Sequence, residues 1–404
     1  MRAQSRGEGV CMFDFTFYAP TKVVFGHKTE EKVGELVAEA GAHKVLVHFG
    51  GKSAKASGLL DRVCASLDAA GIAHVELGGV QPNPHLSLVR SGIELARVEG
   101  VDFVLAVGGG SVIDSAKAIG YGVANDGDVW DFYLRTRKPE ACLPIGVVLT
   151  IAASGSEMSN SSVVTDDSCG DKRSCGSNLS RPVFAVMDPE LLATLPAYQT
   201  SCGTTDILMH TMERYFANGG NMQITDAIAE GLMRTVMDNG LRLVDHPDDY
   251  DARAEVMWAG SLSHNGLTGC GNDGGDFLSH NLEHQMSGMF DVAHGAGLAA
   301  VWPSWARYVY KECLPRFVKF AVNVMGVDPA GKDDEAVALL GIDAMERYFR
   351  SIGMPTNMRE LGIEPTEEQL AKMAHDCAVT NHGKRGSAKV CYEQDFLNIY
   401  RMAL

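Results

Sequence analysis

The chain has 404 residues and a formal net charge of −16 at pH 7, with 46% hydrophobic and 21% charged residues. This is the composition of a globular protein long enough for two domains, and the acidic balance excludes nucleic acid as a partner, because phosphate neutralisation needs clustered lysine and arginine. No run approaches the roughly 20 apolar residues of a membrane span, and the start of the chain lacks the apolar core of a secretion signal. We therefore expect a cytoplasmic protein with no membrane partner. Its ten cysteines, none in a CxxC pair, are expected to be free thiols.

Short β-branched runs alternate with helical patterns in the first half of the chain. The runs predicted to be strands are residues 44–49, 101–107, 143–150 and 182–188. Stretches such as GLLDRVCASLDAAG (58–71) have the periodicity of amphipathic helices and lie between the strands. This alternation predicts an α/β dinucleotide-binding domain with a parallel, Rossmann-like sheet over residues 1–195.

The turn FGGKSAKASG (49–58) follows a predicted strand and precedes a helix. Gly50 and Gly51 allow a close approach of the backbone, while Lys52 and Ser53 lie where the ribose end of a nucleotide is expected. Neither repels a 2′-phosphate as an acidic residue would. The alternative is that Lys52 is simply a solvated surface residue.

A second glycine-rich turn lies in VDFVLAVGGGSVIDSAKAIG (101–120). Gly109 and Gly110 follow a buried strand, and Ser111 opens a helix with Asp114 three residues later, close to a capping box. The free N–H groups at such a helix start favour an anion such as a pyrophosphate. The spacing is not the usual GxGxxG, and the alternative is a tight turn without a ligand.

The β-rich runs disappear near residue 195, and long segments of helical periodicity follow, such as TDAIAEGLMRTVMDNGLRLV (225–244) and DDEAVALLGIDAMERYFRSIG (333–353). We predict an all-α domain over residues 196–404. The active site is expected in the cleft between the two domains.

Asp206 and His210 are four residues apart in TDILMHTMERYF (205–216), so a helix would present both on one face. A carboxylate and an imidazole placed in this way form half of a site for a divalent transition metal. Taken alone, the pair is also compatible with a charge at a helix start and a buried, hydrogen-bonded histidine.

Three further histidines lie in DFLSHNLEHQMSGMFDVAHGAG (276–297). His280 and His284 share a helical face, but a straight helix would carry His294 about 21 Å from His280, too far for a common metal. We therefore predict a break in SGMFD, with Gly288 ending one helix and Asp291 capping the next, and close packing at the following GAG. Five candidate donors then compete for about four positions, and the spacing alone does not say which stands aside.

Six motifs together resemble a known family. They are GGVQPNP (78–84), GGGSVIDSAK (108–117), SGSE (154–157), DPELLATLP (188–196), TDILMHTMERYF and HNLEHQMSGMFDVAHGAG (280–297). From Phe13 onward the chain resembles the iron-containing, or group III, alcohol dehydrogenases, and among them the butanol dehydrogenase and NADPH-dependent aldehyde reductase type. The resemblance implies hydride transfer between a nicotinamide coenzyme and a primary alcohol or aldehyde, in a homodimer or higher homo-oligomer.

The resemblance also implies roles for individual residues. Asp206, His210, His280 and His294 would hold one divalent metal, Fe²⁺ or Zn²⁺, and His284 would stand beside the open position as the catalytic proton carrier. The implied coenzyme contacts are Gly50, Gly51, Lys52, Ser53, Pro82, Asn83, Gly109, Gly110, Ser111, Asp114, Thr150 and Lys172. Members that prefer NAD tend to carry an acidic residue near Lys52, so NADP is the expected coenzyme, with NAD possible.

Some features depart from this pattern or support another class. Ala152 stands where the family usually has proline, residues 1–11 have no counterpart, and the glycine-rich GCGNDGGD (269–276) is expected to line the pocket. HNLEH (280–284) is also a literal HxxEH, the signature of zinc peptidases in which Glu283 would activate water. A zinc metallopeptidase is therefore the alternative function.

Overall fold

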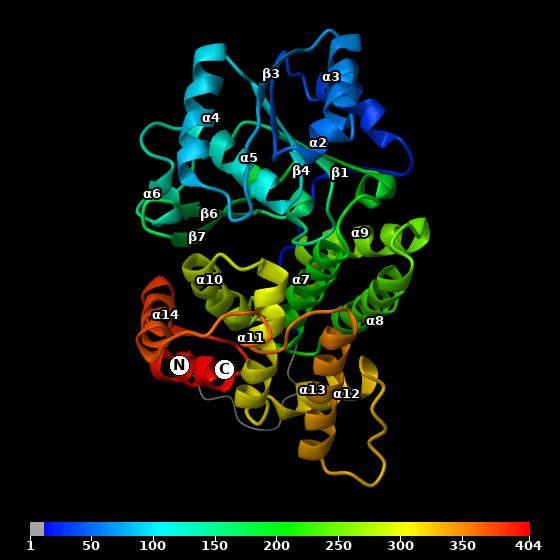
Figure 1. Ribbon diagram of the computed structural model, residues 1–404, viewed down its shortest axis with the longest axis vertical. Coiled ribbons are helices and arrows are strands. Elements are labelled where there is room, and N and C mark those ends of the chain that lie inside the picture. Colours follow the sequence, from blue (N-terminus) through cyan, green and yellow to red (C-terminus); the bar gives the residue numbers. More distant parts are fainter. Residues whose placement is uncertain (1–11) are drawn as a thin grey trace.

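The computed structural model describes residues 12–404, with an α/β half and a helical half lying end to end (Figure 1). Six parallel strands form the main sheet, in the order β1-β8-β5-β4-β2-β3. Their bounds are Lys22–Phe25 (β1), Lys44–Phe49 (β2), Ala73–Leu77 (β3), Phe103–Gly108 (β4), Ile145–Leu149 (β5) and Phe184–Met187 (β8). The parallel sheet is confirmed, and so are the four predicted strands.

Helices cover both faces of this sheet, because successive strand residues point to opposite sides. Val45 and Val47 pack with Val63 in the hydrophobic cluster on one face, whereas Leu46 packs with Ile113 in the cluster on the other. The helices of this half are Val33–Glu39 (α1), Ser53–Ala56 (α2), Leu59–Ala69 (α3), Leu86–Glu99 (α4), Gly110–Ala124 (α5) and Trp130–Tyr133 (α6).

An antiparallel hairpin, Ser161–Asp166 (β6) and Asp171–Gly176 (β7), was not predicted from the sequence. Its polar, serine-rich segments lack the apolar alternation of a half-buried strand. The backbone N–H of Val163 in β6 donates to the Asp114 carboxylate on α5 (2.9 Å), and Lys172 in β7 donates to Ser287 Oγ of the helical half (2.9 Å). The hairpin therefore links the two halves.

The helical half contains nine α-helices in the described chain. They are Ala197–Tyr215 (α7), Gln223–Asp245 (α8), Tyr250–His264 (α9), Leu278–Phe290 (α10), His294–Val309 (α11), Leu314–Asn323 (α12), Asp334–Ser351 (α13), Glu367–Thr380 (α14) and Glu393–Met402 (α15). A two-residue antiparallel ladder, Lys384–Arg385 (β9) with Cys391–Tyr392 (β10), and an isolated bridge between Gly219 and Asn272 depart from the predicted all-α arrangement. Within residues 12–404, no helix is both long and apolar enough to cross a membrane. The exact domain boundary at residue 195 stays a prediction.

Two glycines bring α11 against its neighbours. A Cβ on Gly295 would lie 2.1 Å from the backbone oxygen of Cys202 in α7, and one on Gly297 would lie 2.9 Å from Glu283 Cγ in α10. Any larger side chain would push the helices apart, so the predicted close packing at GAG is confirmed. It places His294, the first residue of α11, next to α7.

The chain does break between His280 and His294, but not at the predicted residues. Helix α10 continues through Gly288 to Phe290, and Asp291 ends it in the left-handed conformation (φ 50°). The residue that precedes α11 is Ala293, so Asp291 does not cap that helix. A short polar side chain tolerates the left-handed region, which lets Asp291 act as a helix stop in place of glycine.

The start of α5 also differs from the expected capping box. The helix begins at Gly110, after Gly109, and no side chain caps it. The carboxylate of Asp114 instead accepts hydrogen bonds from Ser156 Oγ (2.6 Å) and Val163 N (2.9 Å). Asp114 therefore fixes the neighbouring loop and hairpin and leaves the N–H groups at the helix start free for a ligand.

Candidate active site

A cavity of about 980 Å³ lies between the α/β half and the helical half. The order of the strands reverses between β2 and β4, and ligands of open α/β sheets bind at the carboxyl ends of the strands at such a point. Gly109, Gly110 and Ser111 leave the carboxyl end of β4 and line the cavity. The glycine loop is thus where a dinucleotide is expected.

Other predicted coenzyme residues divide into two groups. Pro82, Asn83, Asp114 and Lys172 line the same cavity. The residues that do not line it in the described chain are Gly50, Gly51, Lys52, Ser53 and Thr150. The first four follow β2 at the point of strand reversal, with Lys52 exposed, while the backbone of Thr150 is used to bond Gly108. The glycine-rich segment 269–276, expected to line the pocket, does not; Gly271, Gly274 and Gly275 form left-handed turns there.

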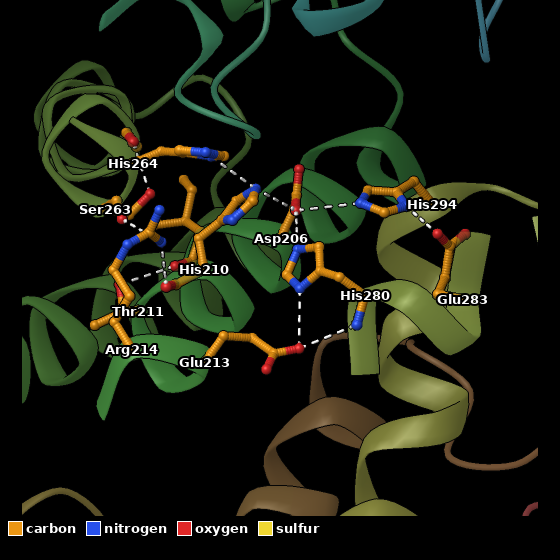
Figure 2. A network of polar contacts seen from close by, with 12 residues as sticks. Asp206, His210, Thr211, Glu213, Arg214, Ser263, His264, His280, Glu283 and His294 are labelled. Carbon is orange, nitrogen blue, oxygen red and sulfur yellow. Dashed lines mark hydrogen bonds and ion pairs between the residues drawn. The ribbon is translucent and has the colours of Figure 1, made fainter. Parts of the chain in front are cut away.

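The predicted metal donors converge from three helices on one carboxylate oxygen (Figure 2). Asp206 Oδ1 of α7 lies 3.4 Å from Nε2 of His210, 3.7 Å from Nε2 of His280 on α10, and 3.6 Å from Nε2 of His294 on α11. Donor atoms about 2 Å from a common tetrahedral ion are separated by distances of this order. The four side chains therefore have the spacing of a coordination shell.

The chemistry of the cluster also fits a cation. Asp206 Oδ1 and His280 Nε2 are buried and have no hydrogen-bond partner among the described residues. Burial alone would lower the pKa of His280, but the carboxylates of Asp206 and Glu213 raise it to about 9. A site that attracts positive charge and leaves buried donor atoms unpaired matches a divalent metal held by nitrogen and oxygen ligands.

Two buried carboxylates orient the imidazoles. Glu213 Oε1 lies 3.1 Å from His280 Nδ1, and Glu283 Oε2 contacts His294 Nδ1. Each carboxylate favours a proton on Nδ1 and so directs the lone pair of Nε2 toward Asp206. Glu213 is on the same face of α7 as Asp206 and His210, and its spacing of three residues after His210 is a signal that could have revealed it.

His284 lines the cavity one turn after His280, with its ring centroid 5.6 Å from that of His294. Burial, followed by the positive charge of Lys172, lowers the pKa of His284 well below its ordinary value, so the ring is neutral near pH 7. A neutral imidazole beside the donor cluster can accept or relay a proton.

The sequence did not indicate His264, the last residue of α9. Its Nδ1 lies 3.1 Å from Nε2 of His210 (Figure 2). His264 also lines the cavity. His264 lies 16 residues before His280, the first histidine of the predicted cluster, and belongs to no spacing motif. The packing of α9 on α7 brings it to the site.

The geometry does not favour the peptidase alternative. Glu283 is fully buried, and its Oε2 contacts His294 and lies 3.8 Å from Lys172 Nζ. Burial would raise the pKa of Glu283, but the charges of His294 and Lys172 outweigh this effect and lower it to about 2. A carboxylate held in this way is a poor general base for activating water.

Two family profiles together cover most of the chain. The one described as "Iron-containing alcohol dehydrogenase" matches residues 20–189, and the one described as "Fe-containing alcohol dehydrogenase family, C-terminal" matches residues 200–404. The chain belongs to the iron-containing alcohol dehydrogenase family.

Individual relatives extend over nearly the whole length. The chain is 39% identical to NADH-dependent butanol dehydrogenase A of Clostridium acetobutylicum, over 96% of this chain and 99% of the relative. It is 34% identical to the NADPH-dependent aldehyde reductase YqhD of Escherichia coli, over 92% and 96%. Among solved structures, NADH-dependent butanol dehydrogenase A of Thermotoga maritima superposes with a TM-score of 0.93 at 38% identity, covering 98% of this chain and 100% of that one.

These relations make the chain an NAD(P)-dependent alcohol dehydrogenase, an oxidoreductase of alcohols and aldehydes. The family implies a nicotinamide coenzyme and a divalent metal, and the donor cluster described above has the composition to hold the latter. No comparison supports a peptidase.

Proposed function

We propose that the protein interconverts primary aldehydes and alcohols of the butanol type, with a metal held by Asp206, His210, His280 and His294. The observation that carries the proposal is the approach of three imidazole nitrogens to a single oxygen of Asp206, at 3.4 to 3.7 Å. When bound, the metal would act as a Lewis acid on the substrate oxygen, and the reduced nicotinamide would supply hydride.

Residues of the chain would bind the coenzyme and supply the proton. The N–H groups at the start of α5, with Gly109, Gly110 and Ser111, would hold the pyrophosphate. Lys172, whose Nζ contacts Asn83 Oδ1 and Ser287 Oγ at 2.9 Å, would bind the coenzyme next to α10. His284 would relay the proton to the substrate oxygen.

The test is metal analysis of protein purified without added metal, combined with butanal reduction followed by coenzyme absorbance. Chelator treatment should abolish reduction, and Fe²⁺ or Zn²⁺ should restore it. Reduction that survives complete metal removal would contradict the proposed centre, and the absence of coenzyme oxidation with every aldehyde would contradict the proposed function.

For the coenzyme, we propose a preference for NADPH over NADH. The support is Lys52, exposed at the carboxyl end of β2, with no acidic residue in the turn GGKS; the names of the relatives divide between the two coenzymes. Lys52→Asp should shift the ratio of kcat/KM values toward NADH, because its carboxylate would repel a 2′-phosphate. Steady-state kinetics with both coenzymes measures this, with the exposed Lys372→Asp as the control; a wild-type preference for NADH would refute it.

We also propose a homodimer or higher homo-oligomer, in the cytoplasm. Phe13, Phe15, Phe17 and Tyr18 are 41 to 52% exposed on the extended segment before the edge strand β1, an apolar surface that a second copy would cover. The nine cysteines of the described chain are free thiols, as expected in a reducing compartment. Light scattering of the purified protein measures the assembly.

A further inference from the structure

One wall of the cavity, formed by the start of α10, the end of α14 and β9, carries several polar side chains beside the apolar Phe277 and Val379. It includes Asn281, Thr380, Asn381, His382 and Arg385. Burying a simple alkyl chain against such groups gives little of the hydrophobic gain that an apolar wall would supply. The end of the substrate that lies here is therefore expected to carry a polar group.

Arg385 is the arginine of this wall, and apart from its contact with the Phe277 ring its guanidinium has no hydrogen-bond or ion-pair partner among the described residues. Its Nε is buried and makes no hydrogen bond within the described chain. Of the other lysine and arginine side chains that line the cavity, Arg173 pairs with Asp171 (2.6 Å) and Lys172 bonds Asn83 and Ser287, while Arg135 is exposed at the α/β half. A buried donor left unpaired is costly, so a ligand that accepts from it gains correspondingly.

The position of Arg385 sets a maximum distance between the group it binds and the metal donors. The ring of Phe277 is 5.7 Å from that of His280, and the guanidinium carbon of Arg385 is again 5.7 Å from the Phe277 ring. The guanidinium carbon of Arg385 is thus no farther from the His280 ring than the sum of these two distances, which limits a substrate that reaches both groups to roughly six carbons or fewer. Arg214 also contacts Phe277, at 4.9 Å, but its guanidinium is bonded to backbone oxygens of α7 and α9.

The backbone of this wall is strained at Phe277. Phe277 has φ 56°, a left-handed conformation that an aromatic residue rarely adopts. Such strain concentrates at ligand-binding positions, where the surrounding structure imposes it. Here it turns the Phe277 ring toward the cavity, next to Arg385.

We propose that the preferred substrates are short aldehydes and alcohols, of up to about six carbons, that carry a carboxylate at the far end, bound by Arg385. A guanidinium pairs with a carboxylate through two parallel N–H···O bonds, which gives both affinity and orientation. With a net charge of −16 the protein repels anions in general, so a local cation is needed to admit one.

This proposal rests on the proposed function and adds the class of substrate. An ω-oxo carboxylate takes a hydride, with its electron pair, from NAD(P)H at the carbonyl carbon and a proton at the carbonyl oxygen. The products are the ω-hydroxy carboxylate and NAD(P)⁺, and the distal carboxylate is unchanged.

The experiment compares substrates of matched length, butanal with 4-oxobutanoate and pentanal with 5-oxopentanoate, on the metal-loaded enzyme. The wild type should show the higher kcat/KM for the oxo acids. Arg385→Gln should reduce kcat/KM for the oxo acids on the order of tenfold, chiefly through KM, and change the values for the plain aldehydes by less than about twofold. Arg385→Lys should keep part of the preference, because it retains the charge without the paired geometry.

Arg401→Gln is the matched control, since Arg401 is an exposed arginine on α15 that pairs with Glu367 away from the cavity. It should leave the substrate preference unchanged. Equal losses for both substrate classes in Arg385→Gln, or a wild-type preference for plain aldehydes, would overturn the carboxylate proposal while leaving the dehydrogenase intact. No coenzyme oxidation with either class would instead refute the proposed function.

Discussion

Asp206 Oδ1 lies close to the Nε2 atoms of three histidines, so each of the four side chains would supply one ligand atom to a metal ion. We expect Asp206→Ala, His210→Ala, His280→Ala and His294→Ala each to lose bound metal and activity together. His284→Ala should keep its metal, because this ring lies beside the cluster and has no contact with Asp206. Elemental analysis of the five purified variants measures this. Full occupancy in any of the first four would mean that the donor set is different.

The residues of the site that could be predicted are those with a helical spacing. Asp206 with His210, and His280 with His284, follow from their separation of four. Spacing alone could not choose four donors from five candidates, and the resemblance to the family supplied that choice. Arg385 and His264 were invisible in the sequence, since a β-ladder and the packing of α9 bring them to the cavity.

At the scale of elements, replacing Gly100 or Gly231 with alanine should change the free energy of unfolding in opposite directions. A Cβ on Gly100 or on Gly231 would meet no atom within 4 Å. Gly100 ends α4 with φ 66°, so Gly100→Ala should lower the free energy of unfolding by about 1 to 2 kcal/mol. Gly231 lies inside α8, so Gly231→Ala should raise it by about 0.5 to 1 kcal/mol.

Urea unfolding of the two variants beside the wild type measures both effects. Because neither alanine makes a new contact, the difference in sign isolates the backbone conformation as the cause. A destabilised Gly231→Ala, or a neutral Gly100→Ala, would contradict the assignment of these helix positions.

The elements themselves were predictable where one periodicity dominates. The ends of the four predicted strands lie within two residues of the observed ends of β2, β4, β5 and β8. The β6–β7 hairpin was missed, because its side chains satisfy polar contacts to α5 and α10 and so lack an apolar pattern. The capping roles predicted for Asp114 and Asp291 were wrong. The carboxylate of Asp114 accepts a hydrogen bond from Val163 in the hairpin, and Asp291 ends α10 through its left-handed backbone. No local sequence motif encodes either role.

At the scale of the whole molecule, stability should decrease in mild acid through His48. This ring is fully buried on β2, with Nδ1 2.9 Å from the Leu77 oxygen on β3 and Nε2 2.8 Å from Ser115 Oγ on α5. Burial lowers its pKa from 6.5 to about 4, against a smaller opposing effect of the bond to Leu77. Between these values the unfolded chain binds the proton and the folded chain does not, so the contribution to stability is complete above pH 6.5 and is lost toward pH 4.

The double variant His48→Leu/Ser115→Ala removes the titrating ring together with the hydroxyl that it contacts, and it should weaken this dependence of stability on pH. Urea midpoints at pH 7, 5.5 and 4.5 should fall less steeply with acid than those of the wild type. His375→Gln, a change at an exposed ring, is the control and should follow the wild type. A double variant with the wild-type slope would show that the acid sensitivity arises elsewhere.

The donors of the cluster all come from residues 206 to 294, after the last strand of the parallel sheet. A ribosome delivers the chain from its N-terminus, and domains fold as units in that order. The sheet and the glycine loop at Gly109 therefore leave the ribosome before His294 has been translated, so the nucleotide-binding half can form while the donor set is incomplete. Metal capture by the proposed donors would in this sense be a late event of biosynthesis, and a shortage of the ion would act on chains whose first half can already fold.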